Sequence, residues 1–150
     1  MAVLRDRPYS QFNFLVDLGT GDTVTAVAGF QEISGLGMEI TTAEYRTGND
    51  PNNSPMKINT LYKVPDVTLK RGVIGALDLF TWLKQVREGN QKSLRTVTIS
   101  LQNEEHSATV LRWKLSNARP IKYTGPSLSG KGSELAIEEL VLSCERIDLE

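Results

Sequence analysis

The stretch LRWKLS, residues 111–116, alternates apolar and polar side chains at every position. Successive side chains of a β-strand point to opposite faces, so this period of two predicts a half-buried strand. Its apolar side would face a core and its polar side water, as in an antiparallel sheet. The polar side is formed by Arg112, Lys114 and Ser116.

Three further stretches show the same alternation. FNFLVDL at 12–18, VTLK at 67–70 and LRTVTISLQ at 94–102 each place most of their apolar side chains on one side. We therefore predict a strand in each. GTGD at 19–22 predicts a reversing turn, after which residues 24–33 would return as the hairpin partner of the first strand.

Residues 75–89 follow a different period. Leu79, Leu83 and Val86 recur at helical spacing and form an apolar stripe. An acidic residue lies in the first turn, two basic residues lie toward the end, and Gly-Asn follows, which agrees with the helix dipole and with a glycine stop. One amphipathic helix is predicted here, with its stripe in the core.

Residues 41–59 contain GNDPNNSP at 48–55, which is rich in turn formers and poor in core residues. The stretch is too long for a hairpin tip, and long irregular connections tend to be functional or disordered. We predict a loop that contacts a partner subunit, with simple disorder as the alternative. The candidate contact residues are Tyr45, Arg46, Asn49, Asp50, Asn52 and Asn53.

Residues 134–148, ELAIEELVLSCERID, are ambiguous. A strand needs a bulge near Glu138 and Glu139, whereas a helix would group four of the apolar residues. The need to close an otherwise open sheet favours the bulged strand. Cys144 is the only cysteine, which excludes an internal disulfide and predicts a buried thiol.

Charge is distributed unevenly along the chain. Residues 1–56 hold three basic and seven acidic side chains, residues 57–131 thirteen and five, and residues 132–150 one and six. Strands from the three segments could neutralise one another within one subunit, or the segments could form complementary faces between subunits. Complementary faces would set register and partner choice more than affinity.

Residues that could carry catalysis are few. His106, the only histidine, lies in QNEEHS, whose composition predicts a solvated hairpin turn. The neighbours Glu104 and Glu105, like Glu138 and Glu139, would point to opposite sides of a strand, which is poor geometry for acid–base work. We interpret both pairs as solvated. The sequence therefore predicts no enzyme, no metal and no cofactor.

Length and composition narrow the class of protein. A chain of 150 residues that is 39% hydrophobic can bury one core, so we predict a single domain over 1–150. The net charge of −1 gives no global attraction for nucleic acid or an anionic membrane. No apolar run approaches the roughly 20 residues of a membrane span or forms a signal peptide, so we expect synthesis in the cytosol and no membrane insertion.

Several motifs together resemble a known family. They are DRPYSQFNF at 6–14, GFQEISGLGMEITTAEYRTG at 29–48, VTLKRGVIG at 67–75 and the stretch from Leu111 to Ile147. In this order they resemble phage tail-tube proteins, as represented in extracellular contractile injection systems of the antifeeding-prophage and virulence-cassette kind. The resemblance spans nearly the whole chain.

This resemblance implies a mainly β (α+β) fold, an antiparallel β-barrel or sandwich with one flanking α-helix. It implies assembly into hexameric rings that stack into the inner tube of a contractile injection system, with a central lumen for a protein toxin or DNA. The implied partners are further copies of the chain, a sheath protein, and baseplate and spike components. The tube would be assembled in the bacterial cytoplasm and reside in a phage-tail-like particle that can be released from the cell.

In such a ring one polar strand face could line the lumen. The candidate lumen-facing or charged-face residues are Thr96, Thr98, Ser100, Arg112 and Lys114. A wet inner face is tolerated by large closed barrels, although exposure on the outside is an equal alternative. Two other functions stay open, a minor ring that initiates the tube at the baseplate and a small-ligand-binding β-barrel.

Overall fold

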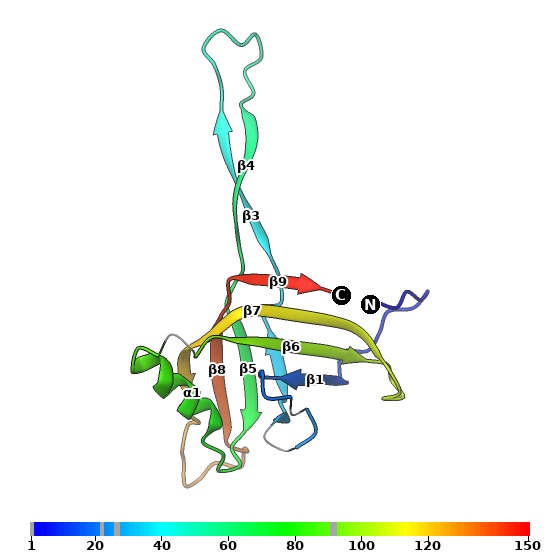
Figure 1. Ribbon diagram of the computed structural model, residues 1–150, viewed down its shortest axis with the longest axis vertical. Helices are drawn as coiled ribbons and strands as arrows, with labels where there is room; N and C mark the ends of the chain where they lie inside the picture. The colour runs from blue at the N-terminus through cyan, green and yellow to red at the C-terminus, as the bar shows by residue number, and fades with distance from the viewer. Residues whose placement is uncertain (1, 22, 26–27, 91–92) are drawn as a thin grey trace.

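One long strand organises the computed structural model, which describes residues 2–21, 23–25, 28–90 and 93–150 (Figure 1). The first part of β7 (Thr109–Thr124) pairs with β6 (Arg95–Gln102) on one side and β9 (Arg146–Leu149) on the other. Its last part pairs with β8 (Ile137–Ser143). β7 therefore belongs to two groups of strands at once.

We call these groups sheet A and sheet B. Sheet A contains β1 (Phe14–Asp17), β6, the first part of β7, and β9. Sheet B contains the end of β7, then β8, β5 (Val67–Gly72) and β2 (Glu32–Ser34). All of these pairs are antiparallel. β7 passes from one sheet to the other between Ala118, which pairs with β6, and Arg119, which pairs with β8.

The core lies between the two sheets. Val97 and Leu115 of sheet A and Leu69 and Leu140 of sheet B are fully buried. The helix α1 (Asp78–Arg87) adds Leu79 and Trp82 to the same cluster.

The α1 helix follows the predicted pattern. Asp78 lies in its first turn, Lys84 and Arg87 lie in its last turn, and Gly89 follows with a φ of 80°. The mainly β prediction with one helix is confirmed, as are the strands around 67–70, 94–102 and 111–116. No helix in the described ranges is long and apolar enough to cross a membrane.

The predicted hairpin between 12–18 and 24–33 is wrong. β1 pairs with β6, and the strand that begins at Glu32 pairs with β5. Asp17 Oδ1 accepts hydrogen bonds from the N–H groups of Gly19 and Gly21, so the chain turns away after β1 instead of returning along it. Residues 22, 26 and 27 of this prediction lie outside the described residues.

The predicted loop at 41–59 is wrong at both of its ends, where the chain forms strands. β3 (Glu39–Tyr45) and β4 (Met56–Lys63) pair antiparallel and project from the body as a long hairpin, which we call the arm (Figure 1). Only residues 46–55 form an irregular tip. The sequence of these strands lacks a clear alternation of apolar and polar residues. The whole of β4 and most of β3 are exposed, so neither face is uniformly apolar.

The final stretch forms two strands, β8 and β9, and its predicted bulge near Glu138 and Glu139 is wrong. β8 pairs with β5 in unbroken register from Ile137 to Leu142, and the irregularity falls on β7 instead. Glu138 faces the core and is only 4% exposed, so it is not solvated as we expected. The reason is a charged partner, Arg71 of β5, whose Nη2 lies 2.6 Å from Glu138 Oε1.

The base of the arm depends on Gly35, which has a φ of 89°. A Cβ at this position would lie 2.2 Å from the carbonyl oxygen of Asp66, where the chain leaves the arm for β5. We expect Gly35→Ala to lower the free energy of unfolding by about 1–3 kcal/mol from backbone strain alone. Denaturant unfolding measures this change.

Gly37→Ala is the matched control for this prediction. Nothing lies within 4 Å of a Cβ built at Gly37, so this substitution should leave stability nearly unchanged. Equal midpoints for the two variants would contradict the close approach at Gly35.

Candidate functional site

The arm is a two-stranded ribbon with few supports. Its register places Ala43 opposite Ile58 and Tyr45 opposite Met56, which makes one face of its outer half apolar. The neighbouring pair Glu44 and Lys57 lies on the other face, which is polar. The outer half of the arm therefore has two chemically different sides.

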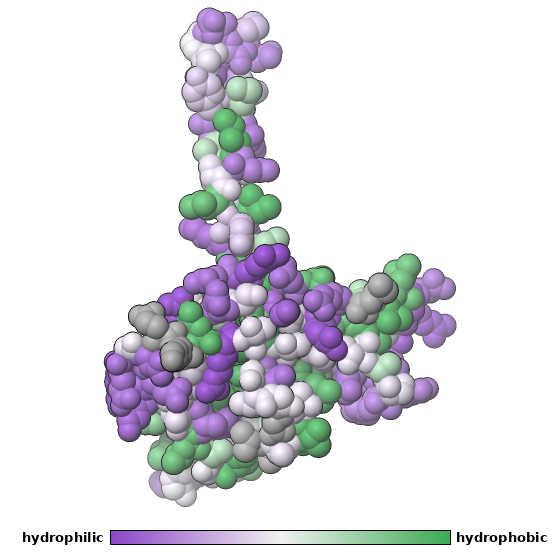
Figure 2. All heavy atoms as spheres, viewed as in Figure 1, coloured by the Kyte–Doolittle hydropathy of each residue, from purple (hydrophilic) through white to green (hydrophobic). Residues whose placement is uncertain are grey.

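Large apolar side chains are exposed along both strands of the arm, interleaved with polar ones (Figure 2). Tyr45 is 53% exposed, Met56 is 55% exposed and Leu61 is 79% exposed. An isolated two-stranded hairpin is at best marginally stable in water, and large exposed apolar patches mark interaction sites. The arm thus has the chemistry of a segment that is covered by a partner.

The tip of the arm is organised by Arg46. Its Nε donates to the carbonyl oxygen of Asn52 at 3.0 Å and its Nη2 to that of Asp50 at 3.1 Å. The N–H of Asn52 also donates to Asp50 Oδ1. Arg46 therefore stabilises the turn rather than pointing freely outward.

The structure brings the predicted contact residues together at the far end of the arm. Asn49, Asp50, Asn52 and Asn53 lie in the tip and Tyr45 ends β3. The apolar arm residues were missed. They are Ile40, Met56, Ile58, Leu61 and Tyr62. The signal that could have found them is the apolar content of MKINTLYK directly after the turn formers.

A second set of exposed apolar side chains lies at the other end of the molecule. The β5–α1 and β7–β8 connections lie away from the arm (Figure 1). Val73 and Ile74 are about half exposed, Leu77 is 72% exposed, and Leu128 and Leu135 are more than 85% exposed. We call these five residues the end patch. Leu128 and Leu135 lie in the connection between β7 and β8.

The predicted charged face is a real face of sheet A. Thr98 of β6 lies opposite Lys114 of β7, and Ser100 lies opposite Arg112. Thr96 shares their side of β6. The intervening residues Val97 and Ile99 are in the core, so the five candidates point away from it.

Ion pairs within the subunit join the three charge segments of the chain. Lys70 Nζ lies 3.3 Å from Glu32 Oε2, and Arg119 Nη2 lies 3.2 Å from Glu145 Oε1. Together with the Arg71–Glu138 pair, these contacts connect the basic middle segment to both acidic segments. Local neutralisation therefore accounts for at least part of the uneven charge distribution.

The Arg71 site is a buried network that joins four elements. The Arg71 side chain is 1% exposed and contacts Asp78 of α1 at 2.8 Å as well as Glu138 of β8. Tyr123 of β7 donates its hydroxyl to Glu138 Oε2 at 2.6 Å. Burial acts to lower the pKa of Arg71, but hydrogen bonds to both carboxylates outweigh it and raise the pKa. The hydrogen bond to Glu138 also raises the pKa of Tyr123.

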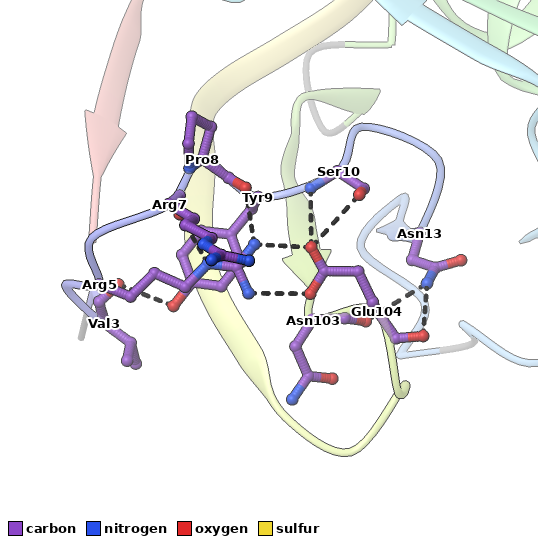
Figure 3. Close-up of polar contacts among 9 residues, drawn as sticks. All are labelled: Val3, Arg5, Arg7, Pro8, Tyr9, Ser10, Asn13, Asn103 and Glu104. Atoms are coloured by element: carbon purple, nitrogen blue, oxygen red, sulfur yellow. Dashed lines mark hydrogen bonds and ion pairs between the residues drawn. The ribbon is translucent and has the colours of Figure 1, made fainter.

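A second network fixes the segment before β1 (Figure 3). Arg5 Nη1 and Nη2 donate to the two carboxylate oxygens of Glu104 at 2.9 and 2.6 Å, and Nη2 also donates to the carbonyl oxygen of Pro8. The guanidinium lies 3.8 Å from the centre of the Tyr9 ring. The N–H of Ser10 donates to Glu104 as well. Residues 3–10 are thereby held against the β6–β7 turn, and we call them the N-terminal strap.

We expect Glu104→Gln to release the N-terminal strap at neutral pH. The Arg5 hydrogen bonds lower the pKa of Glu104 from 4.5 to about 2, so their stabilisation is present above pH 4.5 and is lost as the pH falls toward 2. In the variant, trypsin should cleave after Arg5 several-fold faster than in the unmodified protein. The protection of the strap amides in the unmodified protein, measured relative to the intrinsic exchange rate at each pH, should fall between pH 4.5 and 2.

Glu105→Gln is the control for the strap, since this neighbour lies in the same exposed turn. Its cleavage rate should match the unmodified protein. If Glu104→Gln were also unchanged, the strap would be held by contacts other than the Arg5–Glu104 pair.

Catalytic chemistry finds little support in the geometry. His106 is exposed in the β6–β7 turn with a φ of 59°, which confirms the solvated-turn prediction. Cys144 is buried as predicted, and burial raises the pKa of its thiol. In the part of the chain that the structure describes, no three His, Cys, Asp or Glu side chains are grouped to hold a metal ion.

Comparison with solved structures finds close likenesses of the whole fold. A chain of the PVC sheath–tube complex of an extracellular contractile injection system is 28% identical with a TM-score of 0.82, over 95% of this chain and 91% of that one. A chain of the anti-feeding prophage cap, described as a tube-terminating cap, is 28% identical with a TM-score of 0.84, over 100% and 95%. A chain of the PVC sheath/tube terminator is 28% identical with a TM-score of 0.83, over 97% and 98%.

Comparison with curated protein sequences finds no match. The family model described as T4-like virus tail tube protein gp19 matches residues 10–148, which is nearly the whole chain. The resemblance drawn from the sequence motifs is confirmed. The chain belongs to the T4-like virus tail tube protein family, a family of structural proteins and not of enzymes.

Proposed function

We propose that this chain is the inner-tube subunit of a contractile, phage-tail-like injection system of the extracellular kind. Six copies close a ring, and rings stack around a lumen through which cargo passes. The whole of residues 1–150 acts as one tail-tube domain. The observation that carries this proposal is the arm, an exposed and partly apolar ribbon that projects from an otherwise well-packed body.

The arm and the end patch support stacking. They lie at opposite ends of the molecule and both expose apolar side chains (Figure 1). A contact between two different surfaces of identical copies is heterologous, and along an axis it repeats without closing. The arm of a subunit in one ring reaching a subunit in the next ring would cover an unsupported ribbon and extend the tube.

The proposed partners follow from the same assembly. The 28% identity to a chain in a sheath–tube complex supports a sheath protein around the tube. Baseplate and spike components would bind the tube at one end. The tube would be built in the bacterial cytoplasm and become part of a particle that can act outside the cell.

Analytical ultracentrifugation over a wide range of protein concentration tests the proposal. We expect species larger than the monomer that grow with concentration, since stacking is open-ended. A strictly monomeric protein, both alone and with baseplate components present, would contradict it.

A minor ring at one end of the tube is the second candidate. Two of the similar chains come from structures described as a tube-terminating cap and a sheath/tube terminator. An initiating ring at the baseplate is the corresponding alternative at the other end. Copy number in purified particles separates these functions, because a main tube subunit should be among the most abundant proteins and a ring subunit should be scarce.

A further inference from the structure

The outer face of sheet A carries charge in an ordered pattern. One row across the four strands runs through Asp17 of β1, Thr98 of β6, Lys114 of β7 and Asp148 of β9. These residues are adjacent in register, so their side chains lie on the same face. The row places an acid at each edge, a base on the central strand and a hydroxyl between them.

The next row repeats this pattern in part. Leu15, Ser100 and Arg112 are neighbours on β1, β6 and β7, and the backbone of Glu150 pairs with that of Arg112. On the other side of the Lys114 row, Ser116 of β7 lies opposite Arg146 of β9. Across these rows the bases are Arg112, Lys114 and Arg146, and the acids are Asp17, Asp148 and Glu150. The face is therefore polar and balanced in charge.

This face differs from the surfaces that are suited to subunit contact. The arm, the end patch and the outer side of α1, where Phe80 is 45% exposed, all present large apolar side chains. In the rows described above Leu15 is the only apolar member, and it is half-buried. Covering a mixed-charge face would cost desolvation of its charges, so this face is best left in water.

We propose, on the basis of the tube function proposed above, that the outer face of sheet A lines the lumen and forms a charge-balanced wall that passes polypeptide cargo of mixed charge. In a ring, the acid–hydroxyl–base–acid order of each subunit repeats around the channel. Stripes of opposite sign then alternate, and no net charge accumulates along the tube.

The net charge of the lumen wall decides which kind of polymer can move along it. A channel with a net positive wall would hold a nucleic acid, because each phosphate contact releases counterions and the contacts add along the chain. A net negative wall would hold a basic polypeptide in the same way. Each exposed ion pair is weak. On a wall with equal numbers of acidic and basic side chains, a polypeptide of mixed charge therefore meets no long run of favourable contacts. Such a chain can move through.

Cysteine labelling tests the position of the face. Ser100→Cys places a thiol in the middle of it, and the unmodified protein, whose Cys144 is buried, gives the background. In tubes we expect the introduced thiol to react with a small maleimide, which enters at the ends, and not with a maleimide on a large polyethylene glycol. Reaction with both reagents would place the face outside, and reaction with neither would place it in a subunit contact; either result would overturn the proposal.

Fluorescence quenching tests the charge balance at the same position. A dye attached to the introduced thiol in assembled tubes should be quenched by iodide and by caesium ions in the same ratio as the free dye, with neutral acrylamide as the reference for access. Enhanced iodide quenching would reveal a positive wall suited to nucleic acid, and enhanced caesium quenching a negative wall; both would overturn the proposal. If Ser100→Cys and unmodified protein form no tubes, the proposed function fails instead.

Discussion

Replacing Arg71 by methionine is expected to lower the free energy of unfolding by about 3–5 kcal/mol, because it leaves the buried carboxylate of Glu138 without its partner. Arg71 and Glu138 are 1% and 4% exposed, so water cannot take over the lost interaction. Asp78 would lose its contact with β5 at the start of α1. Urea unfolding followed by circular dichroism measures the loss.

The Arg71 prediction has a matched control on the surface. Arg119→Met removes a pair with Glu145 whose side chains are 42% and 56% exposed, so it should cost at most about 1 kcal/mol. Arg71→Met combined with Glu138→Gln should cost less than the sum of the two single changes, since the unpaired charge is gone. Equal effects of Arg71→Met and Arg119→Met would show that the network contributes no more than a surface pair.

Placing lysines on the apolar face of the arm is expected to abolish tube growth. In Tyr45→Lys with Ile58→Lys the two positions are about half exposed, so the monomer should keep its stability within about 0.5 kcal/mol. If this face docks on the next ring, each ring-to-ring contact must bury several charges, and the penalty is repeated around the ring. Sedimentation and electron microscopy of the variant measure assembly, and circular dichroism confirms the fold.

The polar face of the arm supplies the control. Glu44 and Lys57 lie opposite each other, and changing both to glutamine should leave tube growth intact. Replacing residues 48–54 by a short glycine-serine turn should weaken stacking without unfolding the body. Amide exchange in β3 and β4 should be fast in the monomer and slow in the tube. The arm would be excluded as a stacking element if Tyr45→Lys with Ile58→Lys formed normal tubes and the amides of β3 and β4 exchanged equally fast in monomer and tube.

The body of the fold could be predicted from the sequence because its strands are half-buried. Leu111, Trp113 and Leu115 alternate with polar residues, and the structure places Leu115 in the core and the polar residues outside. The helix was predictable for the same reason, since Leu79 is buried against the sheets. One apolar and one polar side produce the periodic signal on which such a prediction depends.

The arm and the Arg71 network could not be predicted in this way. Both faces of β4 are exposed, so its apolar residues do not follow a core-facing period. The partner of Glu138 lies 67 residues earlier in the chain, and no local pattern reveals a pairing at that separation. The residues predicted as lumen candidates lie on one face of sheet A because β6 and β7 pair in register; their position in a lumen stays a prediction.

Negative-stain electron microscopy of the purified protein tests the central claim most directly. We expect rings with a central hole at low concentration and tubes of uniform width built from stacked rings at higher concentration. The arm variant Tyr45→Lys with Ile58→Lys should stop at single rings under the same conditions. Dispersed single particles at every concentration, with baseplate components added and the fold intact, would contradict the assignment of this chain as a tube subunit.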